Sequence, residues 1–419
     1  MVKKILKYTV LVILVYIYLH DPFLFPTFGI FGRAQYQMSI FILYFLSLVY
    51  AIINFAEIKQ LFRQFRTECL FVLFFFAFSL FVTVLGGDSS FVKSHFFTIF
   101  KDILIPFFLI CLMKKWGFTS FNDCVKILLL VSAVACVGTV FLLLNEDINN
   151  VYKFFMYQGD MLDQLESNQR GFSFSSSQTY SFGIIQGAML GFSLFFSKEN
   201  KWFLLFLPLV FLSALFNART GCVVAIAGLL LYLFSTGQKQ FGVKFFLVLI
   251  GVICFLNFDK ILELLGVNDS TIRWITAFFD ETSSTVKSRH VVDGTASTLF
   301  GEMIVLPDTL PEWFFGKGYT YFGGIKEPGV SSDVGFINQL AYGGLFYVIP
   351  LYVWIYKMLK KIRYRTSLLF TLFWFSVFLI ANIKGSFVPS SGGFNLWILV
   401  YFCIVHFQTN KVCNTLSSQ

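Results

Sequence analysis

Long apolar segments follow one another along almost the whole chain, and they restrict its fold more than any other feature. A helix needs about 20 mostly apolar residues to cross a lipid bilayer. Windows of that size predict about twelve transmembrane helices, near residues 5–20, 38–55, 69–86, 96–113, 124–144, 180–197, 201–217, 220–235, 243–257, 334–356, 366–383 and 392–408. The expected fold is an all-α polytopic integral membrane protein.

The composition excludes a soluble protein of this size. Hydrophobic residues make up 57% of the 419 residues and charged residues only 13%, which leaves too little polar surface for a soluble domain. The first apolar run follows Lys3, Lys4 and Lys7 and resembles a signal peptide, but no small-residue cleavage site comes before His20. We therefore expect an uncleaved first helix.

One long polar stretch, residues 258–333, interrupts the apolar pattern. It contains Arg273, Arg289, His290 and eleven acidic residues, so it cannot lie in lipid. The pattern predicts a membrane domain at 1–257 with about nine helices and a smaller outer loop at 145–179, a long extracytoplasmic loop at 258–333, three helices in 334–408 and a tail at 409–419. Any chemistry is expected on the side of these two loops.

Loop charges indicate the orientation, because cytoplasmic loops carry an excess of Lys and Arg. With the N-terminus inside, the inner loops hold most of the basic residues and few of the acidic ones, and the outer side is acidic. Both termini are therefore predicted to be cytoplasmic. The net charge of +9 follows from this topology, and no nucleic-acid partner is needed to explain it.

The spacing of the potential metal ligands argues against a metal site. None of the eight cysteines lies in either predicted outer loop, and no CxxC motif occurs. Neither a disulfide framework nor a cysteine metal site is expected. The acidic and histidine residues show no metal-ligand spacing either, so we expect no metal and no cofactor.

Three outward-facing segments could carry chemistry, and the first is Asn-Ala-Arg-Thr-Gly at 217–221. It places Arg219 where one predicted helix ends and the next begins. A helix start presents free N–H groups and partial positive charge, so a guanidinium beside it favours an anion, particularly a phosphate. Lipid head groups and lipid-linked diphosphates supply phosphate at this boundary. The alternative is an interfacial Arg219 that snorkels to water and anchors the hairpin.

The second segment is Asn-Gln-Arg-Gly-Phe at 168–172, followed by several serines before the sixth predicted helix. Its amide and hydroxyl groups could bind a sugar. Arg170 is expected at the same membrane face as Arg219. The alternative is an ordinary polar loop that caps the next helix.

The third segment closes the long loop. Lys317 stands between two glycines, which permit a tight turn and close approach of the backbone to a ligand. Asp333 follows Ser332 where the chain re-enters the membrane, a costly place for a carboxylate without a partner. A Gly-Gly pair follows at 343–344. The alternative is that Asp333 is only the N-cap of the tenth predicted helix.

The order of these segments resembles the O-antigen polymerase and ligase superfamily. Arg-Gly precedes one helix, Arg-Thr-Gly stands at the next outer hairpin, and the long loop leads to Gly-x-Gly, Ser-Asp-x-Gly and Gly-Gly. The layout covers most of the chain, and the motifs cover a small part of it. The ligase branch typically has a histidine near the position of Asp333. The four histidines here are elsewhere, at His20, His95, His290 and His406, which favours the polymerase branch.

The resemblance implies a metal-independent glycosyltransferase of the bacterial cytoplasmic (inner) membrane, which acts in lipopolysaccharide or related polysaccharide biosynthesis. Its substrates would be oligosaccharide repeat units on polyprenyl diphosphate, such as undecaprenyl diphosphate. Membrane lipids and a chain-length regulator protein would be its partners. Asp333 or His290 would be the general base. Diphosphate or glycan would be bound by Arg170, Arg219, Arg273, Arg289 and Lys317.

Other functions are compatible with many membrane helices and basic residues. A flippase for lipid-linked oligosaccharides, or another polysaccharide exporter, would place its basic residues along an inner cavity. The arginine candidates here cluster at outer loops instead. An O-antigen ligase is the alternative within the same superfamily.

Overall fold

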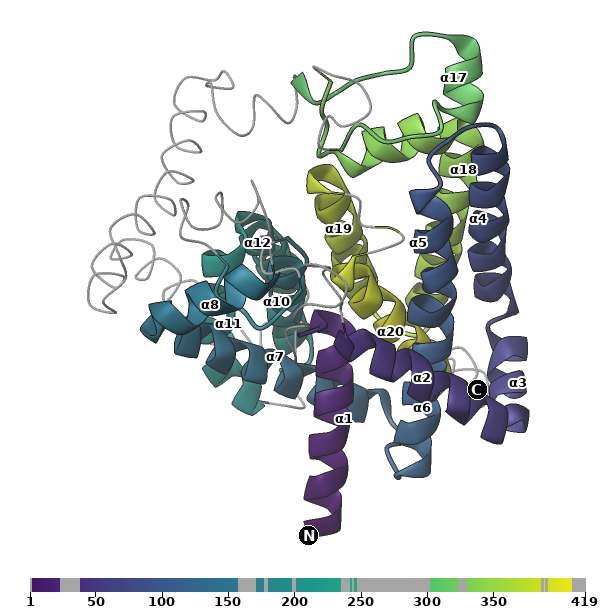
Figure 1. The fold of residues 1–419 in the computed structure, drawn as a ribbon. Helices are drawn as coiled ribbons and strands as arrows, with labels where there is room; N and C mark the ends of the chain where they lie inside the picture. Colours follow the sequence, from purple (N-terminus) through teal and green to yellow (C-terminus); the bar gives the residue numbers. More distant parts are fainter. Residues whose placement is uncertain are drawn as a thin grey trace. The chain divides into compact units, whose positions relative to one another are not determined.

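The computed structural model describes residues 2–22, 38–156, 171–176, 180–197, 201–234, 302–322, 330–385 and 391–408, together with a few isolated positions. All regular structure in these residues is helical, as expected from the apolar pattern (Figure 1). The helices are α1 (Val2–His20), α2 (Met38–Ile53), α3 (Phe55–Gln64), α4 (Arg66–Val84), α5 (Ser90–Thr98), η1 (Ile99–Leu104), α6 (Ile105–Lys115), α7 (Phe121–Leu144), α8 (Glu146–Met156), α10 (Tyr180–Phe195), η2 (Lys201–Phe206), α11 (Leu207–Asn217), α12 (Arg219–Leu233), α17 (Leu310–Phe315), α18 (Gly335–Arg363), α19 (Leu368–Lys384) and α20 (Gly392–Phe407).

Several of these helices are long and apolar enough to cross a membrane. In the described residues they are α4, α7, α18 and the continuous helix Ser90–Lys115, which comprises α5, η1 and α6. A fifth span results if α2 and α3, which meet at 102°, cross together. The helices α10, α11, α12, α19 and α20 are apolar but shorter. The structure therefore indicates a membrane protein, and the total of about twelve spans stays a prediction.

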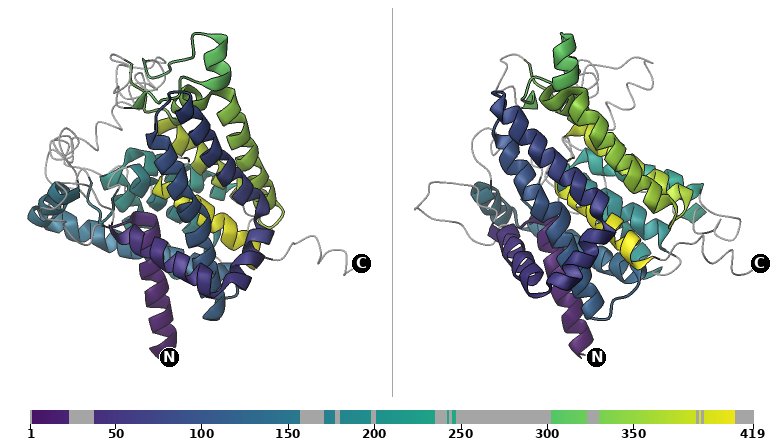
Figure 2. Two further views of the ribbon diagram at one scale, coloured as in Figure 1. Left: turned by 45° about the vertical axis from the view of Figure 1, so that its right-hand side comes forward. Right: turned by 90° about the vertical axis from the view of Figure 1, so that its right-hand side faces the viewer.

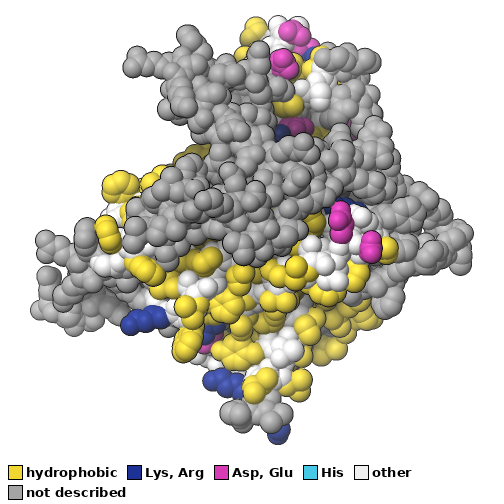
Figure 3. Space-filling model, turned by 90° about the vertical axis from the view of Figure 1, so that its left-hand side faces the viewer, with side chains coloured by type: hydrophobic (Ala, Val, Ile, Leu, Met, Phe, Trp, Pro, Cys, Tyr) yellow, Lys and Arg dark blue, Asp and Glu magenta, His cyan; other side chains and the backbone are white. Residues whose placement is uncertain are grey.

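Large apolar side chains face outward on the long helices. Ile53, Val84 and Leu144 are 74%, 85% and 71% exposed. Hydrophobic side chains cover much of the described surface on the face shown in Figure 3. Soluble monomers rarely expose apolar patches larger than a few hundred Å². These surfaces are therefore suited to contact with lipid.

The chain divides into two compact units. Unit 1 comprises Met1–Leu24, Gln37–Val131 and Thr295–Gln419, and unit 2 comprises Phe25–Tyr36 and Ser132–Gly294. In unit 1, α18 packs against α4, α19 and α20, and α4 lies beside α5 (Figure 1 and Figure 2). In unit 2, α10 packs against α11 and α12. Arg219 belongs to unit 2, whereas Lys317 and Asp333 belong to unit 1. The domain borders expected at 257 and 333 stay predictions.

Glycines allow α10 and α12 of unit 2 to pack at very short distance. A methyl group on Gly187 would lie 2.1 Å from the carbonyl oxygen of Gly221, and one on Gly221 would lie 2.2 Å from that of Gly183. Gly183 and Gly187 form a Gly-x-x-x-Gly motif on one face of α10, a common contact between membrane helices. This contact fixes the start of α12, which carries Arg219.

Gly187→Ala is expected to destabilise the protein by about 1–3 kcal/mol, because the added methyl group meets backbone atoms that cannot rotate away. Gly138→Ala in α7 is the matched control, since its methyl group would meet only the side chain of Phe174, at 3.2 Å. Unfolding in detergent, followed by circular dichroism, compares the two variants. An equal loss of stability in both variants, or no loss of stability in Gly187→Ala, would contradict the close contact between α10 and α12.

A buried carboxylate joins three helices of unit 1. Glu68 of α4 is fully buried, and its Oε1 accepts hydrogen bonds from Lys361 Nζ of α18, at 2.8 Å, and from the Tyr401 hydroxyl of α20. The Lys361 side chain is 33% exposed, so only the acidic partner is fully removed from solvent. A charge inside a helix bundle is costly unless it is paired, so this cluster constrains how α4, α18 and α20 pack.

Candidate functional site

In unit 2, the structure confirms the helix break expected near Arg219. Helix α11 ends at Asn217 and α12 begins at Arg219. Ala218 between them is extended, with φ −157° and ψ 125°. The first N–H groups of an α-helix have no partner in a preceding turn and give the helix start a partial positive charge. Arg219 therefore stands where the backbone also favours an anion.

Asn217 joins this break to the second predicted segment. Its side-chain oxygen accepts a hydrogen bond from the Phe172 N–H, at 2.8 Å. The N–H of Gly171 donates to the carbonyl of the residue before Asn217, at 3.4 Å. Residues 171–172 are thus fastened to the end of α11. Arg170 itself lies outside the described residues, one position before this fastened segment.

A buried lysine, which the sequence interpretation missed, contacts the same segment. Lys153 of α8 is 2% exposed, and its Nζ lies 5.1 Å from the centroid of the Phe172 ring. With its amide turned to satisfy both neighbours, Asn149 donates to the Gly171 carbonyl at 3.1 Å and accepts from Lys153 Nζ at 3.2 Å. Asn149 and Lys153 are four residues apart, so they share one helix face, and this spacing is the signal that could have found them.

The polar groups of unit 2 suit a ligand that carries phosphate and hydroxyl groups. Phe172 contacts Lys153 of α8 through its ring and Asn217 through its N–H. It therefore links the buried lysine to the break between α11 and α12, where Arg219 begins the second helix. Guanidinium and ammonium groups bind phosphate oxygens through charge-assisted hydrogen bonds, and amides can bind hydroxyl groups. The hydroxyl groups of Ser173 and Ser175 belong to buried side chains, which makes them part of the packing around this segment.

In unit 1, the Gly-x-Gly and Gly-Gly motifs come together. The Lys317 N–H donates to the Ala341 carbonyl at 2.6 Å, and the Gly318 N–H donates to the Tyr342 carbonyl at 3.2 Å. Helix α18 is interrupted at Gly344, which has φ 57° and ψ −160°. In a continuous helix each carbonyl bonds the N–H four residues later, so a break at this position frees these acceptors. The loop that carries Lys317 fills the break.

The Lys317 side chain, a predicted ligand for diphosphate or glycan, lies against an aromatic ring. Its Nζ is 5.4 Å from the centroid of the Tyr321 ring. Gly316 and Gly318 have φ of 74° and 79°, which residues with side chains rarely adopt. The Gly318 carbonyl accepts a hydrogen bond from the Asp88 N–H at 2.8 Å, which ties the loop to the α4–α5 turn. The tight turn is confirmed, and the ligand role of Lys317 stays a prediction.

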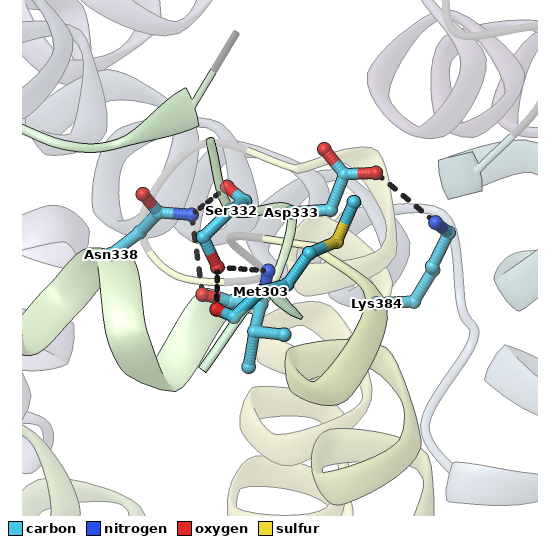
Figure 4. A network of polar contacts seen from close by, with 6 residues as sticks. Met303, Ser332, Asp333, Asn338 and Lys384 are labelled. Atoms are coloured by element: carbon cyan, nitrogen blue, oxygen red, sulfur yellow. Dashed lines mark hydrogen bonds and ion pairs between the residues drawn. The ribbon is translucent and has the colours of Figure 1, made fainter. Parts of the chain in front are cut away.

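Asp333 forms an ion pair instead of a helix cap (Figure 4). Lys384 Nζ, at the end of α19, lies 3.1 Å from Asp333 Oδ2, and both side chains are 34% exposed. Val334 is the N-cap position of α18, and no side chain caps that helix. The alternative interpretation of Asp333 as an N-cap is therefore wrong. The sequence interpretation missed Lys384, whose only local signal is a charge at the end of an apolar run.

Ser332 and Asn338 hold the backbone around Asp333 in place (Figure 4). The Ser332 hydroxyl donates to the Met303 carbonyl at 2.7 Å, and Asn338 Nδ2 donates to the Ser332 carbonyl at 2.7 Å and to the Val334 carbonyl at 3.2 Å. The side chains of Ser332 and Asn338 are fully buried. A buried network with satisfied donors is rigid, so it positions the more exposed carboxylate of Asp333.

Three of the predicted site residues are described: Arg219 lies in unit 2, and Lys317 and Asp333 lie in unit 1. The roles of the others stay predictions, because they lie outside the described residues; they are Arg170, Arg273, Arg289 and His290. In the described part of the chain, no group of three or more His, Cys, Asp or Glu side chains could hold a metal ion.

No family model, curated protein or solved structure matches the chain.

Proposed function

We propose that the protein is a glycosyltransferase of the O-antigen polymerase type, which joins oligosaccharide repeat units on polyprenyl diphosphate at the outer face of the bacterial cytoplasmic membrane. The attachment of residues 171–172 to Asn217 carries this proposal. It fastens the segment that follows Arg170 to the helix break at which Arg219 begins α12. A diphosphate is best bound by more than one cation at a helix start, which supports a shared site for both arginines.

In the proposed reaction, a hydroxyl group of one repeat unit attacks the anomeric carbon of the growing glycan. The bond between that carbon and the polyprenyl diphosphate breaks, and negative charge develops on the departing diphosphate. Arg219 and Arg170 stabilise this charge more strongly than they stabilise the bound substrate, which lowers the barrier. Arg273 or Arg289 adds a further cation from the long loop.

The attacking hydroxyl group must pass its proton to a base that is held within hydrogen-bond reach. Asp333 is one candidate, because its carboxylate is partly exposed while its backbone is positioned by buried Ser332 and Asn338. His290 is the other candidate, because its usual pKa lies closer to neutral pH. Lys317 is assigned to the glycan or the diphosphate.

The surface polysaccharide of cells that lack the protein tests this proposal. Loss of a polymerase is expected to leave single repeat units capped onto the surface lipid, visible as one short band on a gel in place of a ladder. Loss of a flippase would leave no repeat unit on that lipid, and loss of a ligase would leave long polymer on the polyprenyl carrier. Either of these two patterns would contradict the proposal. Return of the ladder when the wild-type protein is reintroduced is the control.

A further inference from the structure

A basic cavity lies in unit 1 between the start of α1 and the turn that joins α6 to α7. Its volume is about 370 Å³, which is within the range of small-molecule sites. Lys3, Lys4 and Lys7 line it together with one acidic residue, Asp123. The outer-face site proposed above uses none of these residues.

The turn that forms one wall of the cavity is well defined. Gly117, which follows the C-cap residue Trp116, has φ 87°, and the Phe118 N–H donates to the Met113 carbonyl at 3.0 Å, so a left-handed glycine ends α6. At the start of α7, the Ser120 hydroxyl donates to Asp123 Oδ2 at 2.8 Å. The carboxylate of Asp123 therefore already accepts a hydrogen bond at the start of α7.

Two contacts fasten α1 to this turn. The rings of Tyr8 and Phe118 meet edge to face, with centroids 4.7 Å apart and an angle of 86° between the planes. Lys7 Nζ donates to the Trp116 carbonyl at 3.4 Å. These contacts hold the lysines of the first turns of α1 against the end of α6.

Three lysines and only one acidic residue line the cavity, and two of these lysines, Lys3 and Lys4, are exposed. The cavity therefore carries an excess of positive charge, which a phosphate group would balance. We propose that this cavity binds the phosphate head group of an anionic phospholipid. Basic pockets between membrane helices recognise such head groups through the same chemistry.

The surroundings of the cavity favour a lipid over a soluble anion. Ile5 and Leu6, which lie between the lysines in sequence, are 55% and 62% exposed. Trp116 lines the cavity, and tryptophan is enriched at the level of lipid head groups. Apolar side chains at the rim can contact acyl chains while the lysines contact the phosphate. The predicted inner face of the membrane is the side on which anionic lipids would reach it.

Binding can be measured by native mass spectrometry of the full-length protein titrated with phosphatidylglycerol in detergent. Lys7→Gln is expected to weaken binding about fivefold, and the triple change of Lys3, Lys4 and Lys7 to Gln about 100-fold, since each basic residue near an anionic surface contributes about 1 kcal/mol. The matched control changes Lys59, Arg63 and Arg66 to Gln. These side chains are exposed, lie on the same predicted face and are not among the residues that line the cavity, so binding should be unchanged.

Asp123→Asn is the gain-of-binding variant. It removes the one negative charge in the cavity and keeps an oxygen for the Ser120 hydroxyl, so phosphatidylglycerol should bind more tightly. A misfolded variant would not show this gain. Equal binding by the wild type and the triple lysine variant would overturn the proposal. Displacement of the lipid by inorganic phosphate alone would show a site for soluble anions and would overturn the lipid assignment.

Discussion

Lys361→Met is expected to destabilise the protein by about 3–5 kcal/mol, because it leaves a buried carboxylate without its cation. Glu68 is fully buried. In the described residues its carboxylate forms one ion pair, in which Lys361 Nζ lies 2.8 Å from Oε1. Tyr401 still donates a hydrogen bond to the same oxygen, but a neutral hydroxyl group cannot balance the charge. Chemical unfolding in detergent measures the loss in the free energy of unfolding.

The Asp333–Lys384 ion pair supplies the matched control for this prediction. Both of its side chains are 34% exposed, so water can replace the lost partner, and Lys384→Met is expected to cost less than about 1 kcal/mol. The double change of Lys361 to Met and Glu68 to Gln should recover much of the lost stability, because position 68 then carries no buried charge that needs a cation. Equal losses for Lys361→Met and Lys384→Met would show that the burial of Glu68 is not what decides stability here.

Arg219→Ala is expected to slow polymerisation about 10²–10³-fold, which corresponds to about 2.7–4 kcal/mol of lost transition-state stabilisation. The physical reason is that the guanidinium at the start of α12 would meet the departing diphosphate as its charge develops. Transfer of lipid-linked repeat units in isolated membranes measures the rate, and gels of surface polysaccharide show the chain length. The amount of protein in the membrane should stay normal.

Arg219→Lys separates this role from simple anchoring of the hairpin. A lysine can also snorkel to the interface, so it should restore full activity if Arg219 only anchors the α11–α12 hairpin. It should restore activity in part if the guanidinium binds diphosphate through two parallel hydrogen bonds. Arg63→Ala in α3 is the control, because this arginine is exposed, belongs to unit 1 and is not among the predicted site residues. Polymer of normal length in Arg219→Ala would refute the assignment.

The long helices could be predicted because lipid leaves the backbone few alternatives. Every N–H and C=O group inside a bilayer must be satisfied within the segment, so a long apolar run is read as a helix. The windows at 69–86, 124–144 and 334–356 correspond to α4, α7 and α18 to within a few residues at their starts. Helix α18 continues to Arg363, beyond its predicted end, because lysines and arginines are good helix formers outside the apolar core.

The same criterion missed short helices in segments that were expected to be loops. Helix α3 buries Ile58 and Leu61, while most of its exposed residues are polar. A hydropathy window averages over both faces, so an amphipathic helix of ten or eleven residues gives no signal in it. Helix α8, which carries Asn149 and Lys153, was not predicted for the same reason. The candidate site in unit 2 was therefore predicted without its buried lysine.

From its residues alone, this chain can be recognised as a helical membrane protein, because apolar length and loop charge are local properties. Which polar groups meet is not local. Asp333 pairs with Lys384 across 51 positions, Phe172 with Asn217 across 45, and Glu68 with Tyr401 across 333. Polar groups that helix packing removes fully or partly from water generally need a partner, and only that packing selects which partner each one receives.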